Sequence, residues 1–260
     1  MMKGFLAVQR RPFSQRIFSM WGPSMSKTYQ IMGYNDFVNA VLDVGFTLGG
    51  GNDEGVFCLL PWGWDEVPPY ESPVRWHTGD TETDPWQWRI RVLTEDKGIS
   101  YGKVFFKKAG FITREWAPYF IAARRNRKTF AQAYADGTMS QYAKRIYEAI
   151  EESGDLAAHE LKEIVGVSKD DKAAFERALV ELQMKMYITI CGERQKISAK
   201  GEAYSWPSST FCTVESFWGE DVCAKAAATD PTAAAEAITK RVYELNPNAD
   251  AKKVQKLIKG

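Results

Sequence analysis

The clearest pattern of hydrophobic and polar positions lies in the second half of the chain. Apolar residues recur there at the spacing of three and four that marks one face of a helix, which predicts helices over residues 141–152 and 157–165. Gly154 and Gly166 stand at the ends of these two helices. Ser168 is then expected to cap a third helix. The apolar stripe of the third helix consists of Phe175, Ala178, Leu179, Leu182 and Met186.

A hairpin is predicted directly after the third helix. Residues 187–191 and 210–217 are rich in β-branched and aromatic side chains, which predicts two strands, and residues 192–195 are expected to form the turn that joins them. Three helices followed by a hairpin is the order of a winged helix-turn-helix. We therefore expect an α+β fold, mainly helical, with a winged helix at residues 136–222.

The polar face of the third helix is poorly suited to reading DNA. Its outward positions are Lys169, Asp170, Ala173, Glu176, Arg177, Val180, Glu181 and Met184. Residues 136–182 carry eleven acidic and six basic residues, so a phosphate-facing surface there would be repulsive. We expect this helix to pack against another part of the chain, or to dock on a partner, through Val180 and Met184. Base reading by this helix is the alternative.

The first half of the chain predicts short helices separated by irregular structure. A helix begins at Tyr34 with Asn35 as its cap, and the glycines at 49–51 end it in a turn. Residues 56–60 are a strand candidate. A further helix is expected over residues 85–96, because a proline is favoured in the first turn of a helix.

Tryptophan and proline are concentrated between these elements. Five of the nine tryptophans fall within residues 62–88. This segment is too apolar to be a linker, so we expect it to be folded against the rest of the N-terminal region. At the other end of the chain, Ala-rich helices are expected over residues 223–245 and 249–258.

The chain of 260 residues has a formal net charge of only +1, which removes any argument for nucleic acid or membrane binding from total charge. Residues 97–128, however, hold nine basic residues and one acidic residue, interleaved with aromatic rings that could stack on unpaired bases. The candidate nucleic-acid-binding residues are Lys103, Lys107, Lys108, Arg114, Arg124, Arg125 and Arg127. The alternative stays open that these side chains cover a Phe-rich helix pair and form ion pairs with the acidic winged helix.

The densest group of chemically capable side chains begins at Trp76. Carboxylates beside apolar indoles can act as acids or bases. The catalytic candidates are His77, Asp80, Glu82 and Asp84. The alternative is a capped loop, in which Asp80, Thr83 or Asp84 caps the helix that follows. A small-molecule pocket is a second hypothesis for this segment. Its residues would be Trp76, Trp86, Trp88 and Arg89.

The residue inventory excludes several kinds of site. The chain has two histidines and four widely separated cysteines, so we expect no metal site, no cofactor and no disulfide framework. No apolar run approaches the roughly 18 residues of a membrane-spanning helix. We expect a soluble, cytoplasmic protein that makes no membrane contact.

We divide the chain into four parts on these patterns. Residues 25–135 form a Trp-rich and basic region, 136–222 the winged helix, and 223–260 a helical tail. Residues 1–24 are an acid-poor extension that bears Arg and Ser, as transit peptides do. The favoured alternative is that translation begins at Met25.

Several short runs resemble the AlkZ-related bacterial proteins. These are WHTGD at 76–80, DPWQWR at 84–89, FIAARR at 120–125 and GEAYSWP at 201–207, and the resemblance spans roughly residues 30–220. The family is more distantly similar to the AlkZ and YcaQ DNA glycosylases, which are built from tandem winged helices and excise alkylated or cross-linked bases. The resemblance implies a winged-helix architecture, DNA as the partner and a role in DNA repair.

The resemblance transfers no catalytic residue. The glycosylases use a Gln-x-Gln or Gln-x-Asp motif, and no glutamine of this chain is followed at the second position by Gln or Asp. Enzymatic activity is therefore left open, at most glycosylase-like.

Overall fold

The computed structural model describes residues 29–198 and 200–260. The two hypotheses for residues 1–24 lie outside this range. The described chain is an α+β structure with two hydrophobic cores. One core lies around the N-terminal region and the last helices, and the other lies among the helices between residues 130 and 184.

A single antiparallel sheet runs through both cores. Its strands are β1 (Phe46–Leu48), β2 (Ile99–Phe105), β3 (Lys108–Thr113), β4 (Asp155–Ala157), β5 (Ile188–Ile197) and β6 (Ala203–Thr213). The strand order is β1-β3-β2-β5-β6-β4. The two halves of the sheet join where Tyr101 of β2 pairs with Ile190 of β5. A short junction therefore connects the N-terminal core to the second core.

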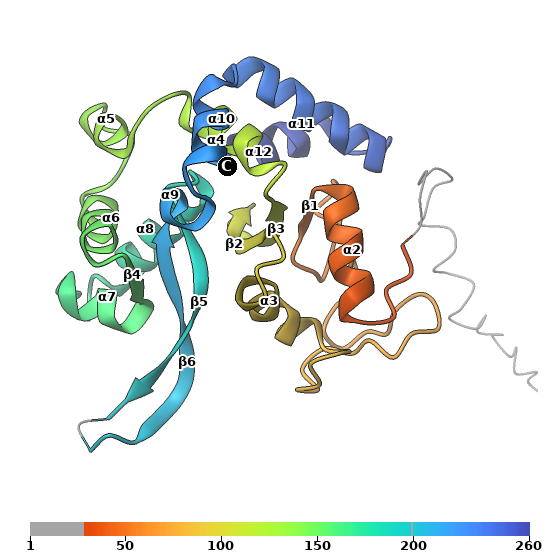
Figure 1. Ribbon diagram of the computed structural model, residues 1–260, viewed down its shortest axis with the longest axis horizontal. Helices are drawn as coiled ribbons and strands as arrows, with labels where there is room; N and C mark the ends of the chain where they lie inside the picture. Colours follow the sequence, from red (N-terminus) through yellow and green to blue (C-terminus); the bar gives the residue numbers. More distant parts are fainter. Residues whose placement is uncertain (1–28, 199) are drawn as a thin grey trace, which may run out of the picture.

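Helices surround the sheet (Figure 1). They are α2 (Tyr34–Val44), α3 (Pro85–Thr94), α4 (Ala117–Arg125), α5 (Phe130–Ala135), α6 (Gln141–Ser153), α7 (Ala158–Ile164), α8 (Lys172–Met184), α9 (Val214–Trp218), α10 (Glu220–Ala228), α11 (Pro231–Leu245) and α12 (Ala251–Lys259). Side chains that accept the free N–H groups of the first turn fix several of the starts. Ser140 caps α6, and Asp230 caps α11.

The three helices and the hairpin of the second half are present, with corrected bounds. The first two helices agree with the prediction to within a residue at each end, and the stripe from Phe175 to Leu182 is buried. The expected cap was wrong, because the Ser168 side chain accepts from the N–H of Asp171 before α8 begins. The expected turn at 192–195 was also wrong. β5 continues through it, since Gly192 sits in an irregular register of the ladder rather than in a turn.

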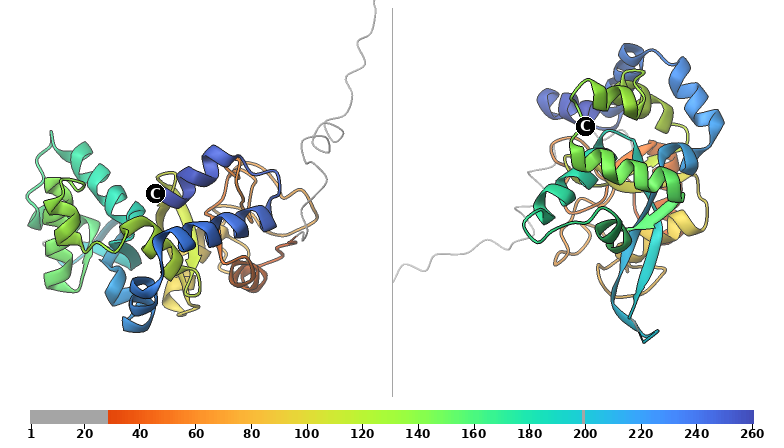
Figure 2. Two further views of the ribbon diagram at one scale, coloured as in Figure 1. Left: turned by 90° about the horizontal axis from the view of Figure 1, so that it is seen from above. Right: turned by 90° about the vertical axis from the view of Figure 1, so that its left-hand side faces the viewer.

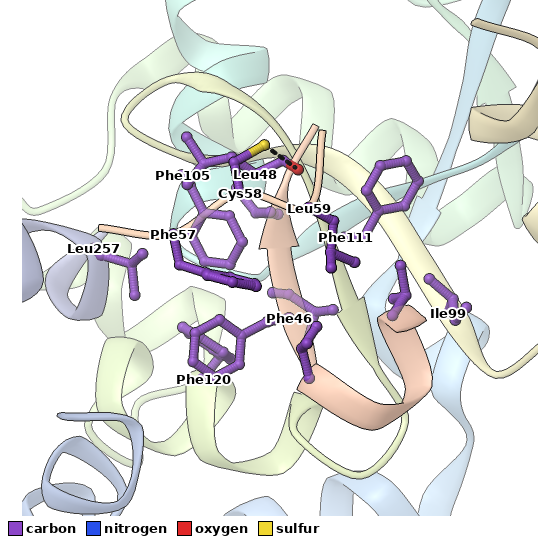
Figure 3. Close-up of a cluster of buried hydrophobic side chains, with 14 of the residues drawn as sticks. Phe46, Leu48, Phe57, Cys58, Leu59, Ile99, Phe105, Phe111, Phe120 and Leu257 are labelled. Atoms are coloured by element: carbon purple, nitrogen blue, oxygen red, sulfur yellow. Dashed lines mark hydrogen bonds between the residues drawn. The ribbon is translucent and has the colours of Figure 1, made fainter. Parts of the chain in front are cut away.

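The N-terminal region differs more from the prediction. The first helix ends at Gly45 (φ 90°), not at the later glycines, and Gly33 rather than Asn35 is its cap. A side chain at Gly45 would collide with the Trp116 ring, 2.2 Å from an ideal Cβ. Residues 56–60 are buried but form no strand. They lie beside β1, where the Cys58 thiol donates a hydrogen bond to the carbonyl oxygen of Leu48 at 3.6 Å (Figure 3).

Residues 97–128 are a hairpin followed by a helix, not a helix pair. β2 and β3 are joined by a tight turn in which Phe106 and Lys107 both have positive φ, at 53° and 63°. Such turns usually carry Asn or Gly, and neither residue occurs at these two positions, so no turn was predicted here. Phe46, Phe105 and Phe120 meet edge to face in the core below the hairpin (Figure 3).

The last helices pack into the N-terminal core. α10, α11 and α12 all contact α4, and Ile238, Val242 and Leu257 are buried among N-terminal residues. The segment expected as a tail thus completes the first core. The single helix expected over 223–245 is broken by Pro231, because Asp230 starts a new helix there.

The Arg124 guanidinium joins these parts. It is buried and donates to the carbonyl oxygens of Met184 at 2.8 Å, Leu257 at 2.7 Å and Ile258 at 3.1 Å. These carbonyls lie in the last turns of α8 and α12, where no N–H of the same helix is free to bind them. Burial lowers the pKa of Arg124 to about 9, so the side chain still carries its charge at neutral pH. One cation therefore satisfies the C-terminal ends of two helices.

One prediction for the outer face of the third helix, α8, is wrong. Met184, expected on the surface, is buried, with only 7% of its area exposed. The side chain of Gln183 accepts from the N–H of Lys103 in β2 at 2.8 Å. The C-terminal end of α8 therefore packs against the N-terminal half of the sheet, which is one of the two roles expected for it.

The contacts of Arg124 predict a large loss of stability when it is removed. Arg124→Met leaves three buried carbonyls without a donor, so we expect the free energy of unfolding to fall by about 3–5 kcal/mol. Arg127→Met is the control, because Arg127 is exposed and pairs with Asp230 only at 3.6 Å. Its expected effect is about 0–1 kcal/mol. Urea unfolding of both variants measures the difference, and equal losses would refute the structural role of Arg124.

Candidate nucleic-acid interface

Asp84 organises the Trp-rich loop that precedes α3. Its carboxylate is fully buried and accepts from the backbone N–H groups of His77 at 2.9 Å, Gly79 at 2.9 Å and Trp86 at 2.8 Å. The last of these bonds caps α3, as the capped-loop alternative expected. All of these contacts belong to the loop itself, so the geometry of Asp84 is that of a structural carboxylate.

The other two carboxylates of the loop also have local partners. The Asp80 side chain accepts from the N–H groups of Glu82 at 2.7 Å and Thr83 at 2.9 Å. These bonds hold the pKa of Asp80 below its usual range, so it stays ionised near neutral pH. Glu82 pairs with Arg91 at 2.6 Å. The structure brings the catalytic candidates together in one loop, where each carboxylate stabilises the loop conformation.

His77 lies between two indole rings on the surface. Its ring centroid is 5.0 Å from that of Trp64 and 5.0 Å from that of Trp86. The guanidinium of Arg89 lies over the Trp86 ring, 3.9 Å from its centroid, in a cation–π contact. Trp64 keeps 63% of its area exposed. The rings meet edge to face and tilted, at 83° and 49°, and we call Trp64, His77 and Trp86 the indole–imidazole stack for their order in space.

The remaining tryptophans of the segment belong to the core. Trp88 is fully buried and stacks on Phe37, with centroids 5.1 Å apart. Trp76 is half-buried and covers Gly50, where an added Cβ would lie 2.5 Å from the indole. The four residues expected to form a small-molecule pocket are therefore divided. Trp86 is exposed, Arg89 is mostly buried against Glu193, and Trp76 and Trp88 serve packing.

The β5–β6 hairpin carries a second group of exposed apolar side chains. Its outer half projects from the body of the molecule as a two-stranded ribbon (Figures 1 and 2). Ile197 and Tyr204 are exposed there, and Trp206 keeps 85% of its area exposed. A tryptophan this exposed on a projecting ribbon contributes nothing to the core of the described chain.

A backbone irregularity holds Trp206 in this position. Ser205 has φ 60°, and the Gln195 side chain donates to the carbonyl oxygens of Tyr204 and Ser205, both at 3.0 Å. A β-bulge of this kind bends a strand and redirects the next side chain. The exposed indole is thus presented by a bulge that a side chain stabilises.

An ion pair connects the hairpin to the stack. Arg89 of α3 contacts Glu193 of β5 at 2.7 Å. The loop before α3 and the hairpin lie at the same end of the molecule, the lower end in Figure 1. We call the exposed rings of these two segments, taken together, the aromatic face. It consists of Trp64, His77, Trp86, Tyr204 and Trp206.

The basic segment expected to bind nucleic acid is split by the fold. Its arginines have partners within the protein: Arg114 with Asp221 at 2.7 Å, Arg125 with Glu215 at 2.5 Å, and Arg127 with Asp230 at 3.6 Å. Arg124 is buried and is not available to a ligand. The alternative that these side chains form ion pairs within the protein therefore holds for the three arginines. Their partners lie in α9, in α10 and at the start of α11, not in residues 136–182 as expected. Arg114 and Arg127 stay exposed within their ion pairs, and Lys108 pairs with Glu54. Lys103 and Lys107 of the β2–β3 hairpin are exposed as well.

Sequence reasoning missed the hairpin rings as site residues. The expected turn at 192–195 left Tyr204 and Trp206 outside any element. One signal was present: both rings stand in a polar run that ends in Pro207 and two serines. Such a run supplies no apolar neighbours to bury a ring.

Two kinds of feature are absent from the described residues. No helix within 29–198 and 200–260 is long and apolar enough to cross a membrane. In the same part of the chain, no three His, Cys, Asp or Glu side chains gather as a metal site would require.

Comparison with known proteins gives one family and one distant structure. A family model described as AlkZ related matches residues 31–259. No curated protein matches the chain. Among solved structures, the Streptomyces sahachiroi DNA glycosylase AlkZ matches at 13% identity and a TM-score of 0.38, over 67% of this chain and 50% of its own. This chain therefore spans half the length of that structure.

The contacts of Asp84 predict that its removal unfolds the loop. Asp84→Ala leaves three N–H groups of the loop without their acceptor, and we expect the free energy of unfolding to fall by about 3 kcal/mol. Asp65→Ala is the control in the same segment, because Asp65 is exposed, and its expected change is within about 0.5 kcal/mol. Chemical denaturation followed by tryptophan fluorescence measures both. A fully stable Asp84→Ala variant would show that the carboxylate has another role.

Proposed function

Because the chain belongs to the AlkZ-related family, we propose that it binds DNA and that the aromatic face is the contact surface for unstacked bases. The exposure of Trp206 on the projecting hairpin carries this proposal. Large exposed apolar side chains that gather on one face mark interaction sites. Bases that have left the duplex stack on such rings irrespective of sequence.

Charge on the hairpin supports nucleic acid over an apolar partner. Lys196 and Lys200 lie on the same ribbon as the exposed rings. Basic groups beside aromatic faces are the combination used by proteins that bind unpaired strands, since the cations contact phosphates and the rings contact bases. Glu193 and Glu202 also lie on the ribbon, so total charge supplies little of the affinity and stacking supplies more.

We place the DNA-binding unit at residues 130–213 and treat it as a winged helix. The second core extends over this range, from Phe130 to Phe211, and holds α6, α7 and α8 together with the start of the hairpin. In this unit the hairpin is the contact element. α8 is not, because its outer face holds Glu176 and Glu181 and its C-terminal end is packed against β2.

A role in DNA repair follows if the bound DNA contains a displaced base. A damaged or mismatched base leaves the stack at lower free-energy cost than a normal base, so exposed rings select such sites. Base excision through the glutamine motif is not part of the proposal, since this chain carries no such motif. No observation favours the small-molecule hypothesis over this one. Of the two apolar residues expected to dock the third helix on a partner, Met184 is buried and Val180 is half-buried, which disfavours that alternative.

The proposal predicts that Trp206→Ala weakens DNA binding without unfolding the protein. Loss of one stacking contact, worth about 1–3 kcal/mol, should raise the dissociation constant for a duplex with one bulged base roughly 5- to 150-fold. The measurement is fluorescence anisotropy of the labelled duplex. The quenching of tryptophan fluorescence by this DNA should also decrease in the variant.

Leu42→Ala is the matched control, because Leu42 is an exposed apolar residue of α2 that lies beside Arg114 and Lys225 rather than beside the rings of the aromatic face. Its affinity should equal that of the unmodified chain. If Trp206→Ala binds the bulged duplex as tightly as the control, the aromatic face is not the contact surface.

A further inference from the structure

We infer that the lysines of α12 and of the β2–β3 turn form a second contact surface for the phosphates of nucleic acid. The inference rests on the proposed function, since it assumes that DNA is the partner. We call this surface the lysine face. It consists of Lys107, Lys185, Lys252, Lys253, Lys256 and Lys259.

The C-terminal helix provides most of the lysine face. Val254, Leu257 and Ile258 form its buried side. Its other side carries four lysines and one glutamine, and no acidic residue occurs between 251 and 259. Lys256 and Lys259 lie in the last turn, where cations interact favourably with the helix dipole, but like charges at this density also repel one another. Packing of α12 thus depends on its apolar side, and the row of lysines on the other side exceeds what capping of one helix end requires.

Two other segments add lysines to the same surface. The ammonium groups of Lys253 and Lys256 lie 5.7 Å and 6.0 Å from the ring centroid of Phe106, in the β2–β3 turn. The next residue of the turn, Lys107, lines a groove together with Lys185 and Gly260. The turn, the end of α8 and the end of α12 thus meet, and Arg124 holds the two helix ends beneath them.

Most of these charges have no counter-ion in the protein. Glu54 pairs with Lys108 and, at 3.6 Å, with Lys253. Within residues 29–198 and 200–260, no acidic side chain forms an ion pair with the five remaining lysines. These are Lys107, Lys185, Lys252, Lys256 and Lys259. Glu176 and Glu181 lie on the α8 side of the groove and reduce the potential there, so the α12 side is the stronger anion site.

The chemistry of lysine favours a phosphate backbone as the ligand. Lysine ammonium groups are mobile point charges that neutralise phosphates without reading bases. An anionic membrane is the competing ligand for a row of lysines, but surface helices that bind membranes insert their apolar side. In α12 that side is buried in the protein core, which favours nucleic acid.

The lysine face and the hairpin tip lie at different ends of the molecule. α12 is at the upper end in Figure 1, and the outer half of the β5–β6 hairpin is at the lower end. The two surfaces can therefore be altered independently. The aromatic face would bind bases, and the lysine face would neutralise backbone charge elsewhere along the same DNA.

The test is the salt dependence of DNA binding. The variant combines Lys252→Gln, Lys256→Gln and Lys259→Gln, which keeps good helix formers at exposed positions. The control combines Lys169→Gln, Lys172→Gln and Lys240→Gln, three exposed lysines on α11 and around the start of α8. Both lose the same charge. Circular dichroism and thermal unfolding confirm that each is folded.

We expect the slope of log affinity against log salt for duplex DNA to become shallower by about two to three in the α12 variant and by less than about one in the control. An unchanged slope in the α12 variant overturns the inference. So does a variant that loses binding only to vesicles of anionic phospholipid, which would assign the face to a membrane.

The two proposals fail in different ways. A wild-type chain without salt-dependent DNA binding overturns both. If the wild-type chain binds DNA and Trp206→Ala weakens that binding, but the salt slope is unchanged in the α12 variant, only the lysine face is overturned.

Discussion

The structure depends on one buried cation. Arg124 donates to carbonyl groups at the ends of α8 and α12, which belong to different parts of the sequence and different cores. Its desolvation is costly, and charge-assisted bonds to three carbonyls offset that cost. The two halves of the sheet are also joined by the pairing of Tyr101 with Ile190, by the bond from the Lys103 N–H to Gln183 and by the Arg89–Glu193 ion pair. The position of the hairpin relative to the N-terminal loop, and of α12 relative to the β2–β3 turn, follows from this fixed joint.

Residues that resemble a reactive site have structural roles here for a similar reason. A loop rich in Trp and Pro has few regular hydrogen bonds, so its backbone N–H groups need other acceptors. Asp84 and Asp80 supply them. The same loop then holds His77 at a positive φ between two indoles. Carboxylates that shape the loop thus give the aromatic face its rigidity, and the exposed rings are the part left free to bind.

The sequence predicted elements whose pattern was local and missed those set by distant contacts. The helix at 141–152 and the capped start of α3 were predicted because periodicity and capping residues are adjacent in the chain. The β2–β3 turn was missed because Phe106 and Lys107 adopt left-handed conformations that only the surrounding sheet enforces. The interior position of Arg124 depends on α12, more than a hundred residues later, so no local pattern could distinguish it from its neighbour Arg125. Trp206 was missed as a site residue because exposure becomes visible only once the hairpin is seen to leave the body of the molecule.

The central claim is that exposed rings at one end of the molecule contact displaced bases. Ultraviolet cross-linking of the chain to a duplex with one bulged base, followed by mass spectrometry of the cross-linked peptides, tests it most directly. The account predicts cross-links in the peptides that contain Trp206 and Tyr204 and in the loop that contains Trp64 and His77. Cross-links confined to α8, with none in the hairpin or the loop, would contradict it.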